Sequence, residues 1–284
     1  MGRLEDKVAV ITQAGGYFGR AVAEAYAEEG AQLYLHDWSE RKEVIEKMTN
    51  ELSAISGKKV LAGVWDITTG KPTKAMTEEI MEAFGHVDIL VNTGMEGGHG
   101  ILFDIREHEW DMCMDRGLKS YFLTCQYIGE EMARVGYGKI INITSIIGRL
   151  GSGGAVPWGA CRGGVDAMTY ALGQSLGEYG VRCVGLARGA TDSTPYTEEA
   201  LAERLTRIPF KRVATEKDII GPAIFLATEE SDWVNGSIVY ADAGYSHAAA
   251  TDREHRATEV PLKKRGTKHL DTPREKDWID TLTT

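Results

Sequence analysis

Short runs of hydrophobic residues alternate with longer amphipathic segments along most of the chain. Runs at 8–11, 33–35, 60–62, 87–91 and 139–144 are separated by stretches whose hydrophobic residues recur every three to four positions, as in amphipathic helices. This alternation predicts an α/β fold, a doubly wound parallel sheet of about seven strands with helices on both faces. The remaining expected elements are helices at 117–134 and 158–179 and strands at 181–187 and 237–240.

Two polar segments depart from this alternation. The first, 190–212, contains Pro195 and Pro209 and follows a predicted strand. Ligands of doubly wound sheets bind at the carboxyl ends of the strands, so this segment is a candidate lid. The second begins where the hydrophobic periodicity stops and charged residues become frequent. We therefore expect one domain over residues 1–246 and a charged C-terminal tail over residues 247–284, either solvated or lying over a neighbouring subunit.

Composition narrows the classes of ligand. The chain has 284 residues, of which 43% are hydrophobic and 7 are prolines, enough to bury one large core. A formal net charge of -10 argues against nucleic acid and against an anionic membrane surface, because both attract basic faces. No apolar run is long enough to span a membrane. A small-molecule ligand or another protein is the expected partner.

The four cysteines are scattered without a CxxC pair, and no His or Cys spacing suggests a zinc site. We therefore expect no metal, and a cytoplasmic location in which thiols stay reduced. The N-terminus carries no apolar signal core, which agrees with that location.

A glycine-rich loop follows the first predicted strand and opens the first helix. It reads Thr-Gln-Ala-Gly-Gly-Tyr-Phe-Gly over residues 12–19. In such loops, backbone N–H groups at a helix N-terminus approach a pyrophosphate, and the helix dipole adds to the attraction. Gly15 and Gly19 suit this role. Tyr17, in contrast, adds a ring where a close backbone approach needs no side chain, and we expect that ring in the pyrophosphate or nicotinamide space.

A second motif lies in the later half of the chain. Ser145 ends the fifth predicted strand, and Trp158 and Arg162 lie one turn apart on the next long helix. With the loop, this pattern resembles the short-chain dehydrogenase/reductase superfamily, which carries Thr-Gly-x-x-x-Gly-x-Gly in the loop and Tyr-x-x-x-Lys on the helix. The resemblance implies a Rossmann-like sheet. It also implies that Gln13 and Tyr17 replace two glycines, Trp158 the catalytic tyrosine and Arg162 the lysine.

The catalytic set implied by the resemblance is largely missing. In the resembled enzymes a tyrosine transfers the substrate proton, a lysine lowers its pKa and a serine orients the substrate oxygen. The indole N–H of Trp158 is a donor only and the guanidinium of Arg162 stays charged, so neither can relay a proton. The family's asparagine aligns with Gly117. Of the four catalytic positions, only Ser145 remains.

An anion site is the chemistry that these replacements still allow. Arg188 follows the sixth predicted strand, where the family has a proline, and can converge with Arg162 on one pocket. Tyr17 is the other residue expected to face a substrate or anion there. Nearby groups that offer substitute chemistry are Glu96, His99 and Cys161.

Parts of a dinucleotide site match the family. Asp37 ends the second predicted strand, where the family places an acid that binds both ribose hydroxyls and favours NAD over NADP. Asp66 closes the third strand at the family's adenine contact, and Asn92 keeps one asparagine of Asn-Asn-Ala-Gly. An acid at a strand end is also a common cap for the next helix, so both roles stay open. If a nucleotide binds, the expected contacts are Gly15, Gly19, Asp37, Asp66 and Asn92.

These features favour a catalytically silent subunit that pairs with an active short-chain dehydrogenase. The resemblance implies a homo- or hetero-oligomer, expected to be a tetramer, assembled through the helices at 117–134 and 158–179. We expect no cofactor, or NAD if any.

Two alternatives stay open. One is a non-redox lyase of halohydrin dehalogenase type, acting on a small halohydrin, an epoxide or another anionic substrate. Its loop pattern, Thr-x-x-x-x-Phe/Tyr-x-Gly, fits Thr12 and Tyr17, and its Ser and Arg spacing fits Ser145 and Arg162, whereas Trp158 stands where it needs a tyrosine. The other is an NAD-dependent oxidoreductase.

Overall fold

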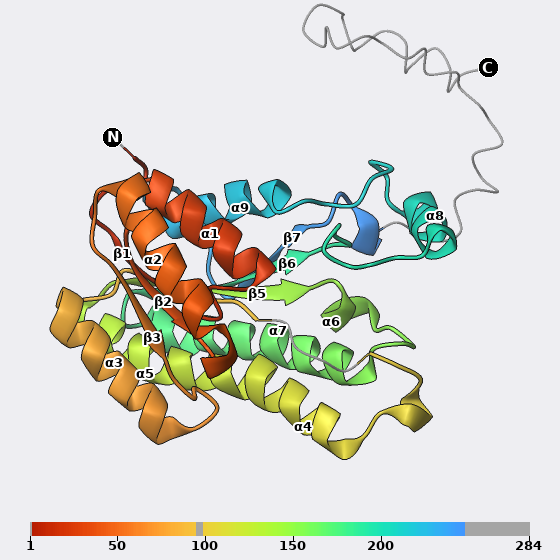
Figure 1. Cartoon of the computed structure of the whole chain (residues 1–284), viewed down its shortest axis with the longest axis horizontal. Helices are drawn as coiled ribbons and strands as arrows, with labels where there is room; N and C mark the ends of the chain where they lie inside the picture. The colour runs from red at the N-terminus through yellow and green to blue at the C-terminus, as the bar shows by residue number, and fades with distance from the viewer. Residues whose placement is uncertain (1, 95–98, 248–284) are drawn as a thin grey trace, which may run out of the picture. The chain divides into compact units, whose positions relative to one another are not determined.

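A computed structural model describes residues 2–94 and 99–247 of the chain. Its centre is a seven-stranded parallel sheet with the strand order β3-β2-β1-β4-β5-β6-β7 (Figure 1). The crossover between β3 and β4 creates the switch point at which doubly wound sheets bind ligands. The predicted Rossmann-like sheet is confirmed. The strands are β1 (Val8–Ile11), β2 (Gln32–Asp37), β3 (Val60–Val64), β4 (Ile89–Asn92), β5 (Gly138–Ser145), β6 (Val181–Arg188) and β7 (Ser237–Ala241).

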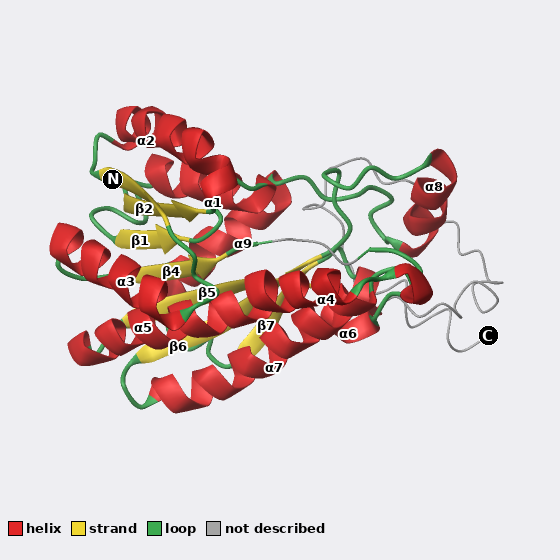
Figure 2. Cartoon of the chain, turned by 60° about the horizontal axis from the view of Figure 1, so that its bottom comes forward, coloured by secondary structure: helices red, strands yellow, loops and turns green. Residues whose placement is uncertain are grey.

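Helices cover both faces of the sheet (Figure 2). Apolar side chains of α1, α2 and α9 pack on one face, and those of α3, α5 and α7 pack on the other. Because both faces are covered, the five inner strands are buried almost throughout, which explains their continuous hydrophobic runs, whereas the edge strands β3 and β7 are mostly half-buried. The helices are α1 (Tyr17–Glu28), α2 (Lys42–Ser56), α3 (Gly70–Phe84), α4 (Glu107–Met114), α5 (Ser120–Val135), α6 (Ile147–Leu150), α7 (Val156–Gly177), α8 (Glu198–Arg207) and α9 (Lys217–Ala227).

The structure differs from the predicted elements near the site. The helix expected over 117–134 begins at Ser120, and a π-helical turn, Asp115–Lys119, joins it to α4. The polar segment after β6 is not irregular throughout, because it contains α8. A bridge between Thr191 and Ala214 closes the base of that segment.

The predicted tail, apart from His247, lies outside the described residues. Within the described ranges, no helix is long and apolar enough to cross a membrane. The same ranges contain no group of three or more His, Cys, Asp or Glu residues that could hold a metal ion.

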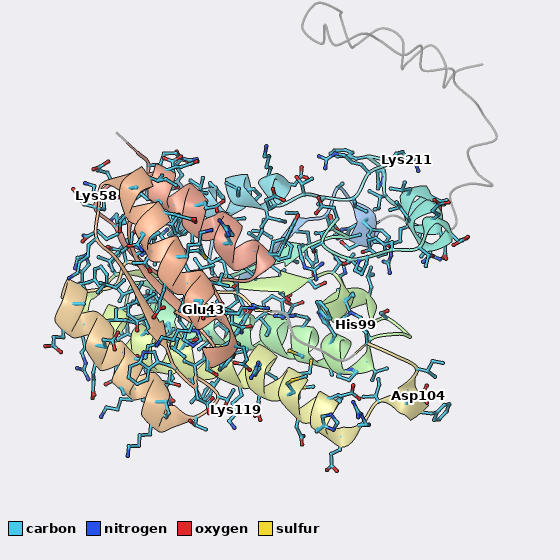
Figure 3. The ribbon with its side chains drawn as sticks, in the orientation of Figure 1. Glu43, Lys58, His99, Asp104, Lys119 and Lys211 are labelled. Carbon is cyan, nitrogen blue, oxygen red and sulfur yellow. The ribbon has the colours of Figure 1, made fainter. Side chains whose placement is uncertain are left out.

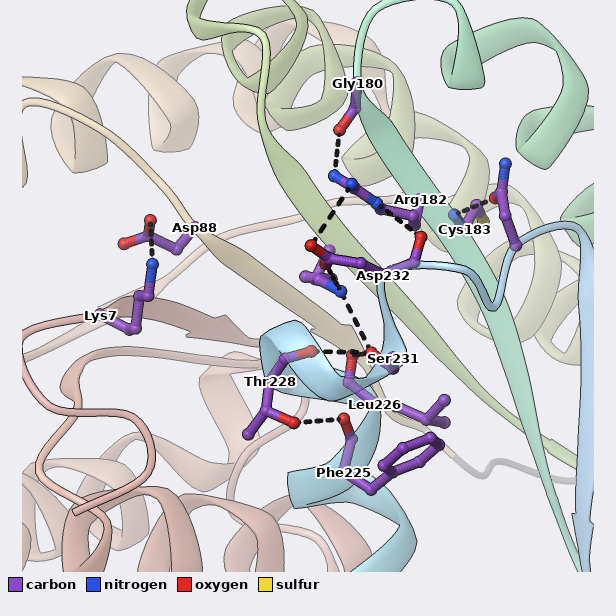
Figure 4. A network of polar contacts seen from close by, with 12 residues as sticks. Lys7, Asp88, Gly180, Arg182, Cys183, Phe225, Leu226, Thr228, Ser231 and Asp232 are labelled. Carbon is purple, nitrogen blue, oxygen red and sulfur yellow. Dashed lines mark hydrogen bonds and ion pairs between the residues drawn. The ribbon is translucent and has the colours of Figure 1, made fainter.

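A buried lysine, Lys139, links strands of the sheet to the turn before β7, and Figure 4 shows its partners Ser231 and Asp232 close to Arg182. Lys139 lies near the start of β5, and its Nζ donates to Asp232 Oδ1 at 2.5 Å and to Ser231 Oγ at 3.1 Å. Arg182 on β6 donates to the Asp232 carbonyl at 3.3 Å. The turn before β7 is thereby tied to the two strands that carry the candidate site at their other ends.

Candidate functional site

The candidate site lies at the carboxyl ends of β5 and β6, where α7 begins. Ser145 and Arg188 end these adjacent strands in register. Trp158 lies in the first turn of α7, and Arg162 lies one turn later on the same side. The structure therefore brings together the four residues that the sequence suggested for this part of the site.

Trp158 lies where the resemblance places the family's catalytic tyrosine. Only 6% of its surface is exposed. The ring of His99, which Figure 3 labels, packs edge-on against it with centroids 4.7 Å apart. The guanidinium carbons of Arg162 and Arg188 lie 5.9 and 5.3 Å from its ring centroid. Its indole N–H has no hydrogen-bond partner among the described residues. This side chain can donate one hydrogen bond but cannot take up a proton.

Arg162 is held by hydrogen bonds that a lysine could not reproduce. Its Nη1 donates to the Tyr121 hydroxyl at 3.3 Å and to the Ile143 carbonyl at 3.2 Å, and its Nη2 donates to the Gly94 carbonyl. Burial alone lowers the pKa of this guanidinium, but the nearby Tyr121 and Cys161 raise it. Arg162 is therefore a fixed cation that joins β4, β5 and α7.

Arg188 places a second guanidinium in the same region. Burial, and then repulsion from Arg162, lowers its pKa to about 10. Its guanidinium carbon lies 5.2 Å from the ring centroid of Phe18, and its Nη1 donates to the Gly189 carbonyl at 3.2 Å. Burial and the charge of Arg188 also lower the pKa of His99. Positive charge is thus concentrated around the Trp158 indole.

Ser145 is the one family catalytic residue that is kept, but its hydroxyl has a structural contact. Its Oγ accepts the Ile147 N–H at 3.3 Å, an interaction typical of a turn entering a short helix. The side chain is almost fully buried. The buried Tyr121 phenol already accepts from Arg162 and donates to the Ile143 carbonyl.

Gly117, at the position of the family's asparagine, lies against a thiol. A Cβ added to Gly117 would lie 2.5 Å from Cys161 Sγ, too close for real atoms. A side chain at this position would therefore require Cys161 to move.

In the glycine-rich loop at 12–19, the side chain of Gln13 packs against the neighbouring backbone. Gln13 replaces a family glycine and has a left-handed φ of 49°, which glycine adopts more easily. Its buried amide donates to the Arg116 carbonyl at 3.1 Å and lies against Gly94. Gly19 allows α1 to approach the Gln13 backbone, as a third loop glycine does in dinucleotide folds.

Asp37 binds this loop. Its Oδ2 accepts the Gly15 N–H at 2.7 Å and its Oδ1 accepts the Trp38 N–H at 2.8 Å, and the carboxylate is buried. The Arg116 guanidinium stacks over the Trp38 ring at 4.6 Å. Both oxygens of the carboxylate that the resemblance assigns to a ribose thus already accept backbone N–H groups.

Tyr17 is 37% exposed and links the loop to the segment after β6. Its hydroxyl contacts the carboxylates of Asp192 and Glu216 and accepts the Glu216 N–H at 3.1 Å. Two carboxylates beside this hydroxyl disfavour an anion at that atom. The expected place of the ring in the pyrophosphate or nicotinamide space stays a prediction.

The other two expected nucleotide contacts serve the fold. The Asp66 carboxylate accepts the N–H and hydroxyl of Thr68 in the turn before α3, and it does not cap that helix, whose N-cap is Thr69. Asn92 is fully buried, accepts the Thr124 hydroxyl at 2.7 Å and donates to Asn142 at 3.0 Å. It therefore faces the core between β4, β5 and α5 and not a ligand.

Three residues of the site were not singled out from the sequence. Phe18, and not Tyr17, is the loop aromatic that reaches Arg188. Cys113 and Tyr121 contact Cys161 and Arg162, respectively. Cys113, Gly117 and Tyr121 are spaced four residues apart, which places them along one side of a helix. This spacing is the sequence feature that could have identified Cys113 and Tyr121, because Gly117 was already aligned with a catalytic position.

Comparisons with known proteins agree with this architecture. A family model described as enoyl-(acyl carrier protein) reductase matches residues 16–246. A 3-oxoacyl-[acyl-carrier-protein] reductase from Thermotoga maritima is 30% identical over 246 residues, 85% of this chain and 98% of that protein. The (2S)-[(R)-hydroxy(phenyl)methyl]succinyl-CoA dehydrogenase subunit BbsD from Thauera aromatica is 33% identical over 249 residues, 86% of this chain and 98% of that protein.

A solved structure gives the same result in three dimensions. A chain described as a short-chain alcohol dehydrogenase from Sinorhizobium meliloti superposes with a TM-score of 0.82 at 27% identity, covering 87% of this chain and 98% of that chain. The family match, the relatives and the shared fold together lead to one assignment. The chain belongs to the short-chain dehydrogenase/reductase superfamily.

Proposed function

We propose that this chain is a catalytically silent subunit that pairs with an active short-chain dehydrogenase. The observation that carries the proposal is the buried Trp158 at the position of the catalytic tyrosine. General acid–base catalysis needs a titratable group within hydrogen-bond reach of the substrate oxygen, and an indole is not one. Ser145 and Arg162, the flanking positions, are engaged in contacts that hold the fold together.

The nucleotide half of the site, meaning the residues expected to contact a dinucleotide, supports the same conclusion. The Gln13 amide lies against Gly94, and Asp37 binds the loop backbone through Gly15. A dinucleotide would have to displace both contacts. The proposed subunit therefore works without a cofactor, or with NAD if any is bound. The relatives that are named reductases or dehydrogenases keep an NAD-dependent oxidoreductase as the less favoured reading.

An apolar face on α5 and α7 suits the pairing. These two helices border a groove of about 540 Å³ whose lining is mostly hydrophobic. The family resemblance implies association through these helices, and a relative of this chain is itself named as a dehydrogenase subunit. We propose that an active dehydrogenase subunit covers this groove in a hetero-oligomer. Its lining residues are Phe122, Cys125, Gln126, Glu130, Ala133, Arg134, Leu172, Leu176 and Tyr179.

Coexpression tests the pairing directly. The chain is produced with a tagged short-chain dehydrogenase that carries Tyr-x-x-x-Lys, taken from the neighbouring reading frames, and the mass of the purified complex is measured. Phe122→Glu in the groove should abolish copurification, because it buries a charge at the contact. Ile55→Glu, at a similarly exposed hydrophobic position on α2, should leave it unchanged. A homotetramer that takes up no second subunit would contradict the proposal.

One observation favours a second candidate function, a non-redox enzyme for an anionic substrate. Arg162 and Arg188 flank the unpartnered indole N–H of Trp158, and such donors suit a halide or carboxylate. Release of halide from a halohydrin by the isolated chain, abolished by Ser145→Ala, would favour this function over the silent subunit. Absence of release leaves the silent subunit as the better account.

A further inference from the structure

Two buried thiols meet beneath the candidate site. Cys113 lies near the end of α4 and Cys161 lies in the second turn of α7, and these helices pack together. Each thiol is the strongest influence on the pKa of the other, and the residues are only 3% and 1% exposed. Both are free cysteines. Because Gly117 has no side chain, Cys161 Sγ has room to reach this position.

The other two cysteines form a natural comparison. Cys125 and Cys183 are also buried and free. The Asn142 amide lies between them, because its Oδ1 is 3.8 Å from Cys125 Sγ and its Nδ2 is 3.5 Å from Cys183 Sγ. An intervening amide prevents these two sulfurs from bonding. Among these cysteines, the thiols of Cys113 and Cys161 lie next to each other, whereas those of Cys125 and Cys183 are separated by the Asn142 amide.

The charge environment also separates the two pairs. Cys113 and the nearby Arg162 lower the pKa of Cys161, against the effect of burial. Burial raises the pKa of Cys125 to about 12. The thiolate is the reactive form of cysteine, and Cys161 directly precedes Arg162 in α7, so we assign the attack to Cys161.

We propose that Cys113 and Cys161 form a peroxide-sensitive dithiol that closes reversibly into a disulfide linking α4 to α7. Hydrogen peroxide is small enough to enter through local opening of a packed interior. The Cys161 thiolate attacks one peroxide oxygen, the S–O bond forms, the O–O bond breaks, and the departing hydroxide takes a proton to become water. The product at Cys161 is a sulfenic acid.

The second step closes the bridge. Cys113 sulfur attacks Cys161 sulfur, the S–S bond forms, the S–O bond breaks, and the hydroxyl leaves with the Cys113 proton as a second water. In total, two thiols lose two electrons and two protons, and one peroxide is reduced to two waters. A dithiol such as dithiothreitol reverses the bridge. Oxidation also removes the Cys161 thiolate from beside Arg162, so it changes the charge of the candidate site.

Peptide mapping tests the bridge on the natural chain. Each cysteine lies in a different tryptic peptide, at 107–116, 120–134, 150–162 and 183–188. After peroxide treatment and alkylation in denaturant, peptides 107–116 and 150–162 should appear joined, lighter by two hydrogen atoms and separable by dithiothreitol. Peptides 120–134 and 183–188 should appear alkylated, as in the untreated chain. This measurement requires no substitution and is independent of the silent-subunit proposal.

Matched variants identify the order of the two steps. Cys113→Ser should stop at the sulfenic acid, which dimedone traps on peptide 150–162, and Cys161→Ser should give neither the bridge nor a dimedone adduct. Cys125→Ser should still form the bridge. Four alkylated cysteines after peroxide treatment, a bridge between 120–134 and 183–188, or sulfonic acid at Cys161 without any bridge would each overturn the proposal.

Discussion

At the residue scale, Gln13 shows how a substitution in a glycine loop is tolerated. A left-handed φ of 49° costs a residue with a Cβ about 1 kcal/mol or more relative to glycine. The buried amide offsets this cost through its hydrogen bond to the Arg116 carbonyl and its packing against Gly94. The side chain that closes the loop is therefore also the one that stabilises the unusual backbone.

The first prediction separates these two contributions. Gln13→Ala loses the amide contacts and keeps the backbone cost, whereas Gln13→Gly loses the same contacts and relieves it. We expect Gln13→Gly to be more stable than Gln13→Ala by about 1 kcal/mol, the reverse of the usual order in helices and strands. Urea unfolding measures the difference. Equal stabilities of the two variants would mean that the backbone at this position carries no cost.

A second residue-scale prediction concerns Asp166, which lies one turn after Arg162 on α7. Burial raises its pKa above 3.8, although the Thr144 hydroxyl and Arg162 lower it in part. The folded state therefore binds this proton more tightly than the unfolded chain does. The free energy of unfolding of the protein then decreases as the pH rises through the folded pKa of Asp166. Asp166→Asn does not titrate.

The unfolding free energy of Asp166→Asn should therefore exceed that of the natural chain at neutral pH, and the difference should shrink as the pH falls through the folded pKa toward 3.8 and then level off. Thermal melts of both proteins across this range give the comparison. Asp218→Asn is the matched control, because the pKa of that carboxylate is lowered by Arg212, so its difference should have the opposite sign at neutral pH.

At the element scale, the strands were predictable and the turns around the site were not. Buried parallel strands carry continuous hydrophobic runs, so the seven strands follow from local sequence. The convergence of Ser145 and Arg188 also follows, because both end adjacent strands. The position of Tyr17 does not follow, since it is set by Asp192, which lies 175 residues away in the chain. The π turn before α5 left no local signal either.

A third prediction tests how the polar network holds β5 to the turn before β7. Asp232→Asn should destabilise the fold by about 1 to 3 kcal/mol, because Lys139 stays buried without its charged partner. Adding Lys139→Met removes the buried cation, so the double variant should recover most of this loss. Denaturant unfolding of the two single variants and the double variant gives the coupling energy. Additive effects would show that the pair contributes no coupling.

At the scale of the whole molecule, the two halves of the site carry different replacements. Around the expected nucleotide, the Gln13 amide donates to the Arg116 carbonyl and Asp37 accepts from the loop backbone, and in the catalytic half Trp158 is buried. None of these residues lines the groove on α5 and α7. The proposed silent subunit requires this combination, a kept fold and contact surface with replaced residues at the site.

The last prediction follows from the independence of these changes. Trp158→Tyr with Arg162→Lys restores the family's catalytic pair but leaves Gln13 and Asp37 in place. The isolated double variant should neither bind NADH, measured by fluorescence titration, nor oxidise it with a carbonyl substrate. In the complex with an active subunit, the same variant should leave turnover unchanged, and substitution of the partner's catalytic tyrosine by phenylalanine should abolish it. Circular dichroism of the isolated variant shows whether it is folded. Saturable NADH binding by this folded variant would mean that the loop is open, and the nucleotide half would then have to be counted as functional.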